Sequence, residues 1–187
     1  MTIKTARLVL RPLGLQDLDT THEYASDPLN TKYMLHLPNK TKDDTAQFLK
    51  NVEKMWEQSM PRYYEFAVML NGQHIGATSV VLNESRQTGW MGWVINKAYW
   101  GKGYATEAAK AVLKFAVNEL GVEKIGATCD YRNESSVKVM KKIGLKLECS
   151  DGMRRYEDSD EDIQELVYFI TAGELCLPLQ NVGRDEK

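Results

Sequence analysis

YWGKGYATEA, residues Tyr99 to Ala108, places two glycines around a lysine directly before an alanine-rich helical pattern. Gly101 and Gly103 allow backbone angles and a close approach that side chains would prevent. The first N–H groups of the following helix lack acceptors inside the helix, and the helix dipole adds partial positive charge there. The stretch is therefore either a tight connection or a binding site for an anion such as a diphosphate.

Strand patterns precede this turn, and a helix follows it. RLVLRPL at residues 7–13 alternates polar and apolar side chains, and Asn71-Gly72, a strong hairpin signal, separates YYEFAVML from HIGATSVVL. TGWMGWVI, residues 88–95, leads into the turn. Behind it, small and apolar residues between Ala105 and Ala116 share one helical stripe. Such a stripe lets a helix lie close to a sheet.

The rest of the chain alternates helices and strands. Residues 14–27 predict a short helix that ends before Pro28, because the residue before a proline avoids helical angles. A second helix is predicted behind Thr41, whose hydroxyl can cap it. Later segments predict a strand, a helix ending at Gly144 and two strands, in VEKIGATCDY, NESSVKVMKKIG, LKLEC and DIQELVYFIT. Because hairpins occupy the middle, we expect an α/β fold (α+β in looser naming) with a mixed sheet.

Length and composition fit one globular domain. The 187 residues include 43% hydrophobic and 27% charged side chains, which is ordinary for such a domain. We place the domain at residues 1–175 and a polar C-terminal tail at residues 176–187. Twenty-four basic and 26 acidic side chains give a net charge of −2. No nucleic-acid partner is therefore expected.

Neither a metal site nor a membrane segment is expected. Cys129, Cys149 and Cys176 are odd in number and form no CxxC pair, which favours a reducing compartment. The three histidines lack metal-ligand spacing and are interpreted as surface or helix-end residues. There is no 18-residue apolar stretch and no signal-peptide pattern, so we expect a cytoplasmic protein.

The glycine turn does not match two common phosphate-binding motifs. A P-loop has serine or threonine directly after its lysine, whereas Lys102 is followed by Gly103. The dinucleotide fingerprint needs a third glycine and a different spacing. The pattern therefore disfavours a nucleotide-binding module.

The hexapeptide Trp100–Ala105 resembles the pyrophosphate loop of the GNAT acetyltransferases, whose pattern is Q/R-x-x-G-x-G/A, although tryptophan replaces the first residue. Longer blocks are similar to the branch of ribosomal-protein N-terminal acetyltransferases: TARLVLRPLGLQDLDTTHEYASDP, MGWVINKAYWGKGYATEAA and NESSVKVMKKIGLKLE. They span most of residues 5–170 in the family's order. The resemblance implies a mostly antiparallel sheet with one splayed parallel pair, at 89–95 and 124–130, and helices on both faces.

The resemblance also implies a binding site for acetyl-CoA as co-substrate, with no metal. Backbone groups of Trp93, Val94 and Ile95 would pair with the pantetheine arm as a strand does. Amides of the turn would hold the pyrophosphate, namely those of Gly101, Lys102, Gly103, Tyr104, Ala105 and Thr106. The Lys102 side chain either adds charge there or is only solvated. Asn133 is expected to cap the next helix and to contact the cofactor near its reactive end.

The family's usual proton-handling residues are missing. Many relatives have a tyrosine where Met140 stands and a glutamate where Trp90 stands. Glu84 is the replacement candidate for the base, with Glu65 a further one. Ser136 or Tyr131 can hydrogen-bond the departing thiolate. Catalysis mainly by positioning of the reactants is the alternative.

The resulting expectation is an N-acetyltransferase that moves an acetyl group from acetyl-CoA to a primary amine by direct attack in a ternary complex. The acceptor can be a protein N-terminus, a polyamine, an amino acid or an antibiotic. The missing proton-handling residues leave an alternative, an acyl-CoA-binding sensor or partner-binding module without turnover. Relatives often form homodimers, but no feature of this sequence establishes one.

Overall fold

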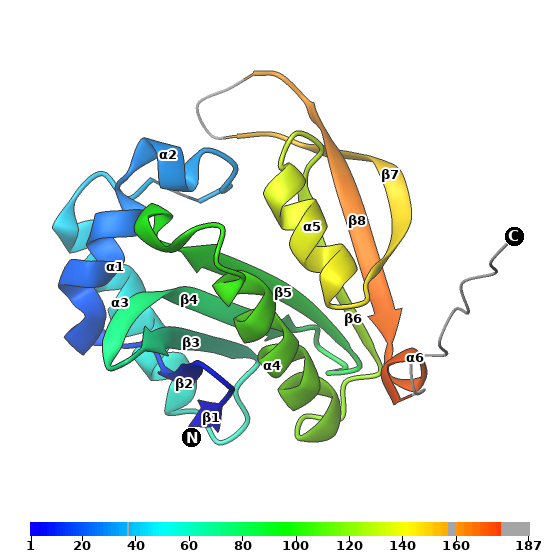
Figure 1. Ribbon diagram of the computed structural model, residues 1–187, viewed down its shortest axis with the longest axis horizontal. Coiled ribbons are helices and arrows are strands. Elements are labelled where there is room, and N and C mark those ends of the chain that lie inside the picture. Colours follow the sequence, from blue (N-terminus) through cyan, green and yellow to red (C-terminus); the bar gives the residue numbers. More distant parts are fainter. Residues whose placement is uncertain (37, 157–159, 177–187) are drawn as a thin grey trace, which may run out of the picture.

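The computed structural model describes residues 1–36, 38–156 and 160–176, and its centre is an eight-stranded sheet in the order β1-β2-β3-β4-β5-β6-β8-β7 (Figure 1). The strands are β1 (Ile3–Lys4), β2 (Leu8–Pro12), β3 (Tyr63–Leu70), β4 (Gln73–Leu82), β5 (Thr88–Ile95), β6 (Lys124–Asp130), β7 (Lys146–Arg154) and β8 (Ile163–Thr171). The helices are η1 (Leu15–Asp17), α1 (Leu18–Ala25), α2 (Pro28–Thr31), α3 (Lys42–Trp56), η2 (Lys97–Tyr99), α4 (Tyr104–Asn118), α5 (Glu134–Lys142) and α6 (Ala172–Cys176).

One pair of neighbouring strands is parallel, β5 with β6, and every other pair is antiparallel. The parallel pairing covers three residue pairs, from Thr88 opposite Lys124 to Trp90 opposite Gly126. Beyond them, residues 91–95 and 127–130 have no partner across the pair. The expected mixed sheet with a splayed parallel pair is confirmed.

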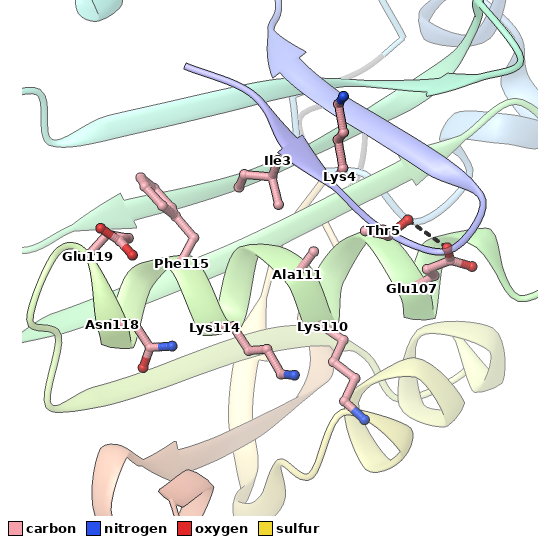
Figure 2. A pocket seen from close by; sticks show the side chains of 10 residues that line it. All are labelled: Ile3, Lys4, Thr5, Glu107, Lys110, Ala111, Lys114, Phe115, Asn118 and Glu119. Carbon is pink, nitrogen blue, oxygen red and sulfur yellow. Dashed lines mark hydrogen bonds between the residues drawn. The ribbon is translucent and has the colours of Figure 1, made fainter.

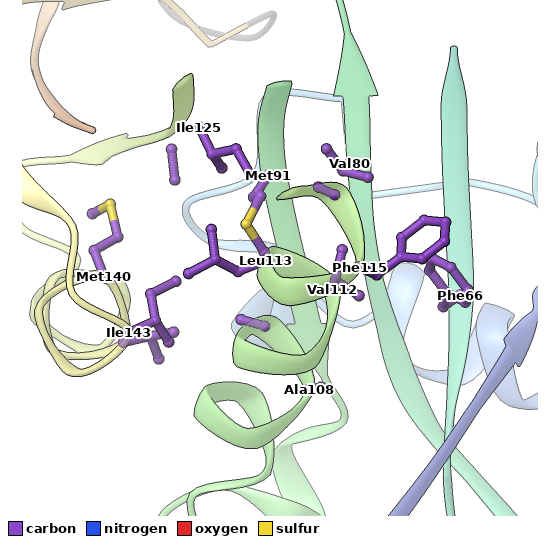
Figure 3. Packing of buried hydrophobic residues seen from close by; sticks show 14 of the residues in the cluster. Phe66, Val80, Met91, Ala108, Val112, Leu113, Phe115, Ile125, Met140 and Ile143 are labelled. Atoms are coloured by element: carbon purple, nitrogen blue, oxygen red, sulfur yellow. The ribbon is translucent and has the colours of Figure 1, made fainter. Parts of the chain in front are cut away.

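Helices cover both faces of this sheet (Figure 1). On one face, α4 packs on β2, β4 and β5, and its buried stripe includes Ala108, Val112 and Ala116. Figure 3 shows the larger core, where Phe115 and Leu113 of α4 meet side chains of the sheet. On the opposite face, α1 and α3 cover β3 and β4 with a smaller core that includes Leu49 and Ala67. Strands β3 and β4 are therefore buried on both sides.

Some elements differ from the prediction. The chain forms a further helical turn, α2, directly after Asp27. Pro28 is tolerated there because it occupies the first position of the helix, and the Asp27 side chain caps the turn. β7 extends to Arg154, well beyond the predicted LKLEC, through two irregularities in its pairing with β8. β1 and α6 were not expected, and both are too short to show a pattern. Residues 177–187 of the predicted tail lie outside the described residues.

Every helix within the described ranges is too short or too polar to span a lipid bilayer.

Candidate active site

The two loops that follow β5 and β6 lie at the open end of the splayed pair. The glycine turn at residues 100–103 follows β5 through η2, and Asn133 follows β6. Parallel strands place their carboxyl ends at the same edge of a sheet, where ligands of α/β proteins commonly bind. The structure therefore brings the candidate cofactor residues of the glycine turn and Asn133 to one edge.

The glycine turn presents a series of free main-chain donors. Gly101 and Gly103 have φ angles of 76° and 81°, in the left-handed region that favours glycine. Gly103 is the N-cap of α4, and the first helical bond runs from the N–H of Glu107 to its carbonyl. Among the hydrogen bonds of the described residues, none begins at the N–H groups of residues 101–106. Six successive donors near a helix N-terminus can receive an anion.

The last residues of β5 have a strand neighbour on one side only. Thr78, Ala77 and Gly76 of β4 lie opposite Trp93, Val94 and Ile95. On the other side β6 has already diverged. The carbonyl of Ile95 accepts hydrogen bonds from Asn30 of α2 at 3.1 Å and from the Trp100 indole at 2.6 Å. This end of β5 is thus held in place while one edge stays open for a ligand that carries amide groups.

A polar anchor beneath the turn escaped the sequence analysis. Arg7 lies between the turn and α4: its guanidinium donates to the Lys102 carbonyl at 2.9 Å and to the Glu107 carboxylate at 2.7 Å. The same guanidinium lies 4.6 Å from the ring centroid of Tyr104. Thr5 donates to Glu107 at 2.6 Å, as Figure 2 shows. Since Arg7 and Glu107 are 100 residues apart, no local spacing could reveal this contact.

Removal of the Arg7 side chain is expected to weaken acetyl-CoA binding. An Arg7→Ala variant frees the Lys102 carbonyl and Glu107, so the turn loses its support. We expect roughly a tenfold higher KM for acetyl-CoA, corresponding to one charge-assisted hydrogen bond. The KM for the amine should stay unchanged. Arg62→Ala, at an exposed arginine, is the control, and equal KM values in both variants would exclude a role for the anchor.

The Lys102 side chain is exposed, and its ammonium lies 5.6 Å from the ring centroid of Tyr99. The contact with Tyr99 keeps the Lys102 ammonium beside the turn, and among the described residues this ammonium forms no ion pair. Both interpretations of Lys102, a phosphate contact or a solvated side chain, remain compatible with this position.

Asn133 caps α5, because its side-chain oxygen accepts from the N–H of Ser136 at 3.1 Å. A buried carboxylate holds the preceding turn: Asp130 accepts from Arg132 at 2.6 Å and from the Tyr156 hydroxyl at 2.8 Å. Burial alone would raise the pKa of Asp130, but these donors hold it at about 2. The Ser136 hydroxyl is half-buried beside Cys129, whose pKa burial raises to about 11. The capping role predicted for Asn133 is confirmed.

The structure separates the two candidate bases. Glu84 is exposed in the turn between β4 and β5, at the paired end of β5. It lies beyond Gly89, which is itself roughly 17 Å along the strand from Val94. Nothing in this geometry brings Glu84 to the open end of the splayed pair. Glu65 is 7% exposed in the middle of β3, which the alternating sequence pattern did not show.

The residues at the family's usual proton-handling positions take other roles. Met140 is fully buried in the larger core (Figure 3). Trp90 is 38% exposed and packs edge-on against Phe169 of β8. Neither can exchange a proton with a substrate.

Burial of Glu65 has a consequence for stability. Desolvation raises its pKa from the usual 4.5 to about 7, although hydrogen bonds from Tyr63 and Ser79 oppose the rise. The unfolded chain therefore loses this proton at lower pH than the folded chain does. Between about pH 4.5 and 7 the folded state binds more protons, so stability falls as the pH rises through this window.

A Glu65→Gln variant should consequently lose less stability than the wild type between pH 5 and pH 8. Denaturant unfolding at the two pH values measures the difference. Glu57→Gln, at an exposed glutamate, should follow the wild type. The same pH dependence in Glu65→Gln and in the wild type would show that the folded protein does not hold this carboxyl protonated.

A hollow of about 430 Å³ lies elsewhere, between β1 and α4 (Figure 2). Lys4, Lys110 and Lys114 line it together with Glu107 and Glu119. No residue of β5, β6 or the glycine turn contributes to its wall. Its mixed charges and its place outside the splayed pair separate it from the candidate site.

Within the described residues, no group of three or more His, Cys, Asp and Glu side chains is arranged to hold a metal ion. The interpretation of His74 as a surface or helix-end residue is wrong. It is 8% exposed, donates to the Gly76 carbonyl at 2.8 Å and contacts Thr20. Burial lowers its pKa, so this imidazole is a neutral structural group.

Comparison with known proteins supports the resemblance. A family model described as an acetyltransferase (GNAT) domain matches residues 7–146. The uncharacterized N-acetyltransferase YnaD of Bacillus subtilis (strain 168) is 33% identical over 157 residues, which are 79% of this chain and 84% of that protein. The crystal structure of a GNAT-family acetyltransferase from Bacillus anthracis has a TM-score of 0.78 and 33% identity, covering 93% of this chain and all of that one.

A third comparison shows the fold alone. The spermidine N-acetyltransferase of Vibrio cholerae, solved in complex with CoA and spermine, has a TM-score of 0.78 at 17% identity and covers 91% of this chain and 99% of that one. The family match spans more than half of the chain, and it includes the glycine turn and the splayed strands. The chain therefore belongs to the GNAT family of acetyltransferases.

Proposed function

We propose that this chain transfers the acetyl group of acetyl-CoA to a primary amine. The observation that carries the proposal is the run of free N–H groups at residues 101–106, placed directly behind a strand whose edge has opened. A diphosphate needs several converging donors, and an amide-bearing arm needs an unpaired strand edge. Acetyl-CoA carries both groups in this order, with its thioester at the far end.

In this arrangement, Trp93, Val94 and Ile95 pair with the pantetheine arm. The thioester carbonyl then lies at the open edge of β5 near Val94, where a main-chain N–H polarises it without any side chain. The neutral amine attacks this carbonyl, the C–S bond breaks, and the sulfur leaves as a thiolate. The second proton of the amine nitrogen passes to the thiolate, which yields the amide and free coenzyme A.

Asn133 and Ser136 serve the reactive end of the cofactor in this proposal. They stand behind β6, on the opposite side of the gap from the glycine turn. The Asn133 oxygen is occupied by the cap of α5, so its amide N–H groups are the part that faces a ligand. The Ser136 hydroxyl can donate a hydrogen bond to the thiolate.

The acceptor class is a primary amine that reaches the gap from the side opposite α4. The Vibrio cholerae relative holds spermine together with CoA, which makes polyamines the first class to test. Short peptides with free N-termini are the second class, because the sequence blocks are similar to those of N-terminal acetyltransferases. The acceptor pocket is formed in part by α1, α2 and α3.

The test follows both products. The protein is incubated with acetyl-CoA and a panel of polyamines, amino acids, aminoglycosides and N-terminal peptides, while free thiol and acceptor mass are measured. Thiol release matched by an acetylated acceptor is expected. Tight binding of acetyl-CoA with no turnover on any amine would instead identify an acyl-CoA sensor, which Met140 and Trp90 at the usual catalytic positions would explain. No binding of acetyl-CoA would overturn both.

A further inference from the structure

A small cluster of buried polar side chains lies on the α1 and α3 face of the sheet. Glu65 occupies its centre, and the Tyr63 hydroxyl of the same strand donates to the Glu65 carboxylate. Ser79 of β4 is the cross-strand partner of Glu65, so the register places its hydroxyl on the same face, beside the Glu65 carboxylate. Tyr24 of α1 is buried nearby, close enough for the Glu65 charge to act on its phenol.

This carboxyl has no cation to balance it. Among the described residues Glu65 forms no ion pair. Arg11 of β2, opposite Ala67 on the same face, pairs instead with Asp17 at 2.6 Å. The Trp56 indole of α3 donates to the main-chain carbonyl of Glu65 at 3.0 Å and not to its carboxylate. Burial raises the pKa values of both Tyr24 and Tyr63, so these phenols remain protonated. An uncompensated buried charge is costly. A buried carboxyl whose pKa is raised toward neutral pH can take up and release a proton near that pH, so it is suited to proton transfer.

The sheet register leads from this carboxyl to the open strand. Glu65 is opposite Ser79, and Ser79 is opposite Gly92 of β5. Directly opposite residues share a face and lie about 5 Å apart. Gly92 comes two residues after the last residue of β5 that pairs with β6, and two before Val94. The line of opposite residues Glu65, Ser79 and Gly92 therefore ends on the part of β5 that no longer pairs with β6, beside which the thioester is proposed to lie.

Gly92 also keeps the Ser79 hydroxyl accessible. A Cβ atom at residue 92 would lie 3.1 Å from the Ser79 oxygen and is the closest contact there. Every larger side chain at this position would cover the hydroxyl. With glycine, a small polar group entering from the α1 and α3 face can reach Ser79.

We propose that Glu65 receives, through the Ser79 hydroxyl, the proton that the incoming ammonium group must lose, and that the amine enters over Gly92. This inference rests on the proposed acetyl transfer and adds the route of one proton. The ammonium N–H bond breaks as its proton passes to the Ser79 oxygen, and the Ser79 proton passes to the Glu65 carboxylate. The neutral amine then attacks the thioester. Glu65 returns its proton to water after product release, so the net reaction releases one proton per ammonium consumed.

Glu65 is a positioning residue in this scheme, because it acts through Ser79. The test measures kcat and KM for an amine substrate between pH 6 and pH 9, together with acetyl-CoA affinity by calorimetry. In the wild type, kcat/KM should rise through an apparent pKa near neutrality. Glu65→Gln should lower kcat roughly 100-fold and remove this inflection, since general-base assistance contributes at least that factor. Affinity for acetyl-CoA should change less than twofold.

Two variants of Ser79 separate the relay from a structural effect. Ser79→Ala removes the hydroxyl and should reproduce the loss in Glu65→Gln, whereas Ser79→Thr retains it and should restore most of kcat. These variants keep the test valid if Glu65→Gln fails to fold. Glu57→Gln, at an exposed glutamate of the same charge, should behave as the wild type.

Two results would overturn the inference while leaving acetyl transfer intact. The first is an unchanged pH profile and kcat in folded Glu65→Gln. The second is full activity in Ser79→Ala. A wild-type protein that binds acetyl-CoA but acetylates no amine would overturn the proposed function itself. The assay of the wild type detects this result before any variant is made.

Discussion

A Gly103→Asp variant is expected to lose acetyl-CoA binding by roughly 100-fold or more. Two unit charges about 4 Å apart interact by about 4 kcal/mol in a partly screened environment, which is close to a thousandfold. A carboxylate at the N-cap of α4 is an anion placed among the free N–H groups of residues 104–106. It competes with the diphosphate for these donors and repels it as well.

Arg7 does not relieve this competition. A Cβ atom at residue 103 would lie 3.6 Å from a guanidinium nitrogen of Arg7. An aspartate that pairs with this guanidinium draws it away from the Lys102 carbonyl and adds a negative charge at the turn all the same. The displaced guanidinium and the added charge both weaken binding of the diphosphate at the glycine turn. Calorimetry measures the resulting loss of affinity for acetyl-CoA.

Gly72→Asp is a matched control for backbone strain. Gly72 has a φ of 82°, almost the same as that of Gly103, with open space around its Cβ position. It lies in the hairpin turn between β3 and β4, away from the glycine turn. Equal loss of acetyl-CoA affinity in both variants would attribute the effect to general strain. Unchanged affinity in Gly103→Asp would show that the diphosphate binds elsewhere.

Local signals predicted most of the fold. Thr41 caps α3, accepting from the N–H of Asp44 at 3.1 Å, and Asn71-Gly72 forms the predicted hairpin turn with positive φ at both residues. Gly121, with a φ of 69°, lies directly behind α4. Such residues act through their own backbone or their nearest neighbours, so a single sequence shows them directly.

Features that depend on distant parts of the chain were not visible. The Arg7–Glu107 contact joins the segment directly before β2 to α4, and no motif links the two positions. Glu65 was expected on an alternating strand, but α1 and α3 cover this face of β3 and bury it. Glu84 follows the second hairpin strand, from which the sequence alone lets it reach the mouth of the cleft, and only the register shows that it stands at the paired end of β5.

The close approach of β4 to the end of β5 depends on one glycine, and a Gly76→Ala variant should show it. Gly76 of β4 has a φ of 157°, and a Cβ atom there would lie 2.2 Å from the main-chain oxygen of Val94 and 2.8 Å from the Cα of Ile95. Both contacts are backbone atoms, which cannot rotate away as a side chain can. We expect a loss of about 2–5 kcal/mol from overpacking and strain, seen as a Tm lower by roughly 5–15 °C.

The damage should reach function as well as stability, because the atoms displaced belong to the arm that pairs with pantetheine. Any folded Gly76→Ala protein should therefore show a raised KM for acetyl-CoA at temperatures well below its Tm. Gly173→Ala is the control, since a Cβ atom there meets nothing within 4 Å, and it should keep the wild-type Tm and KM. A Gly76→Ala protein with unchanged Tm would mean that β5 can shift away from β4 at no cost. In that case the position of Val94, and with it the alignment of the thioester, would not be set by the sheet.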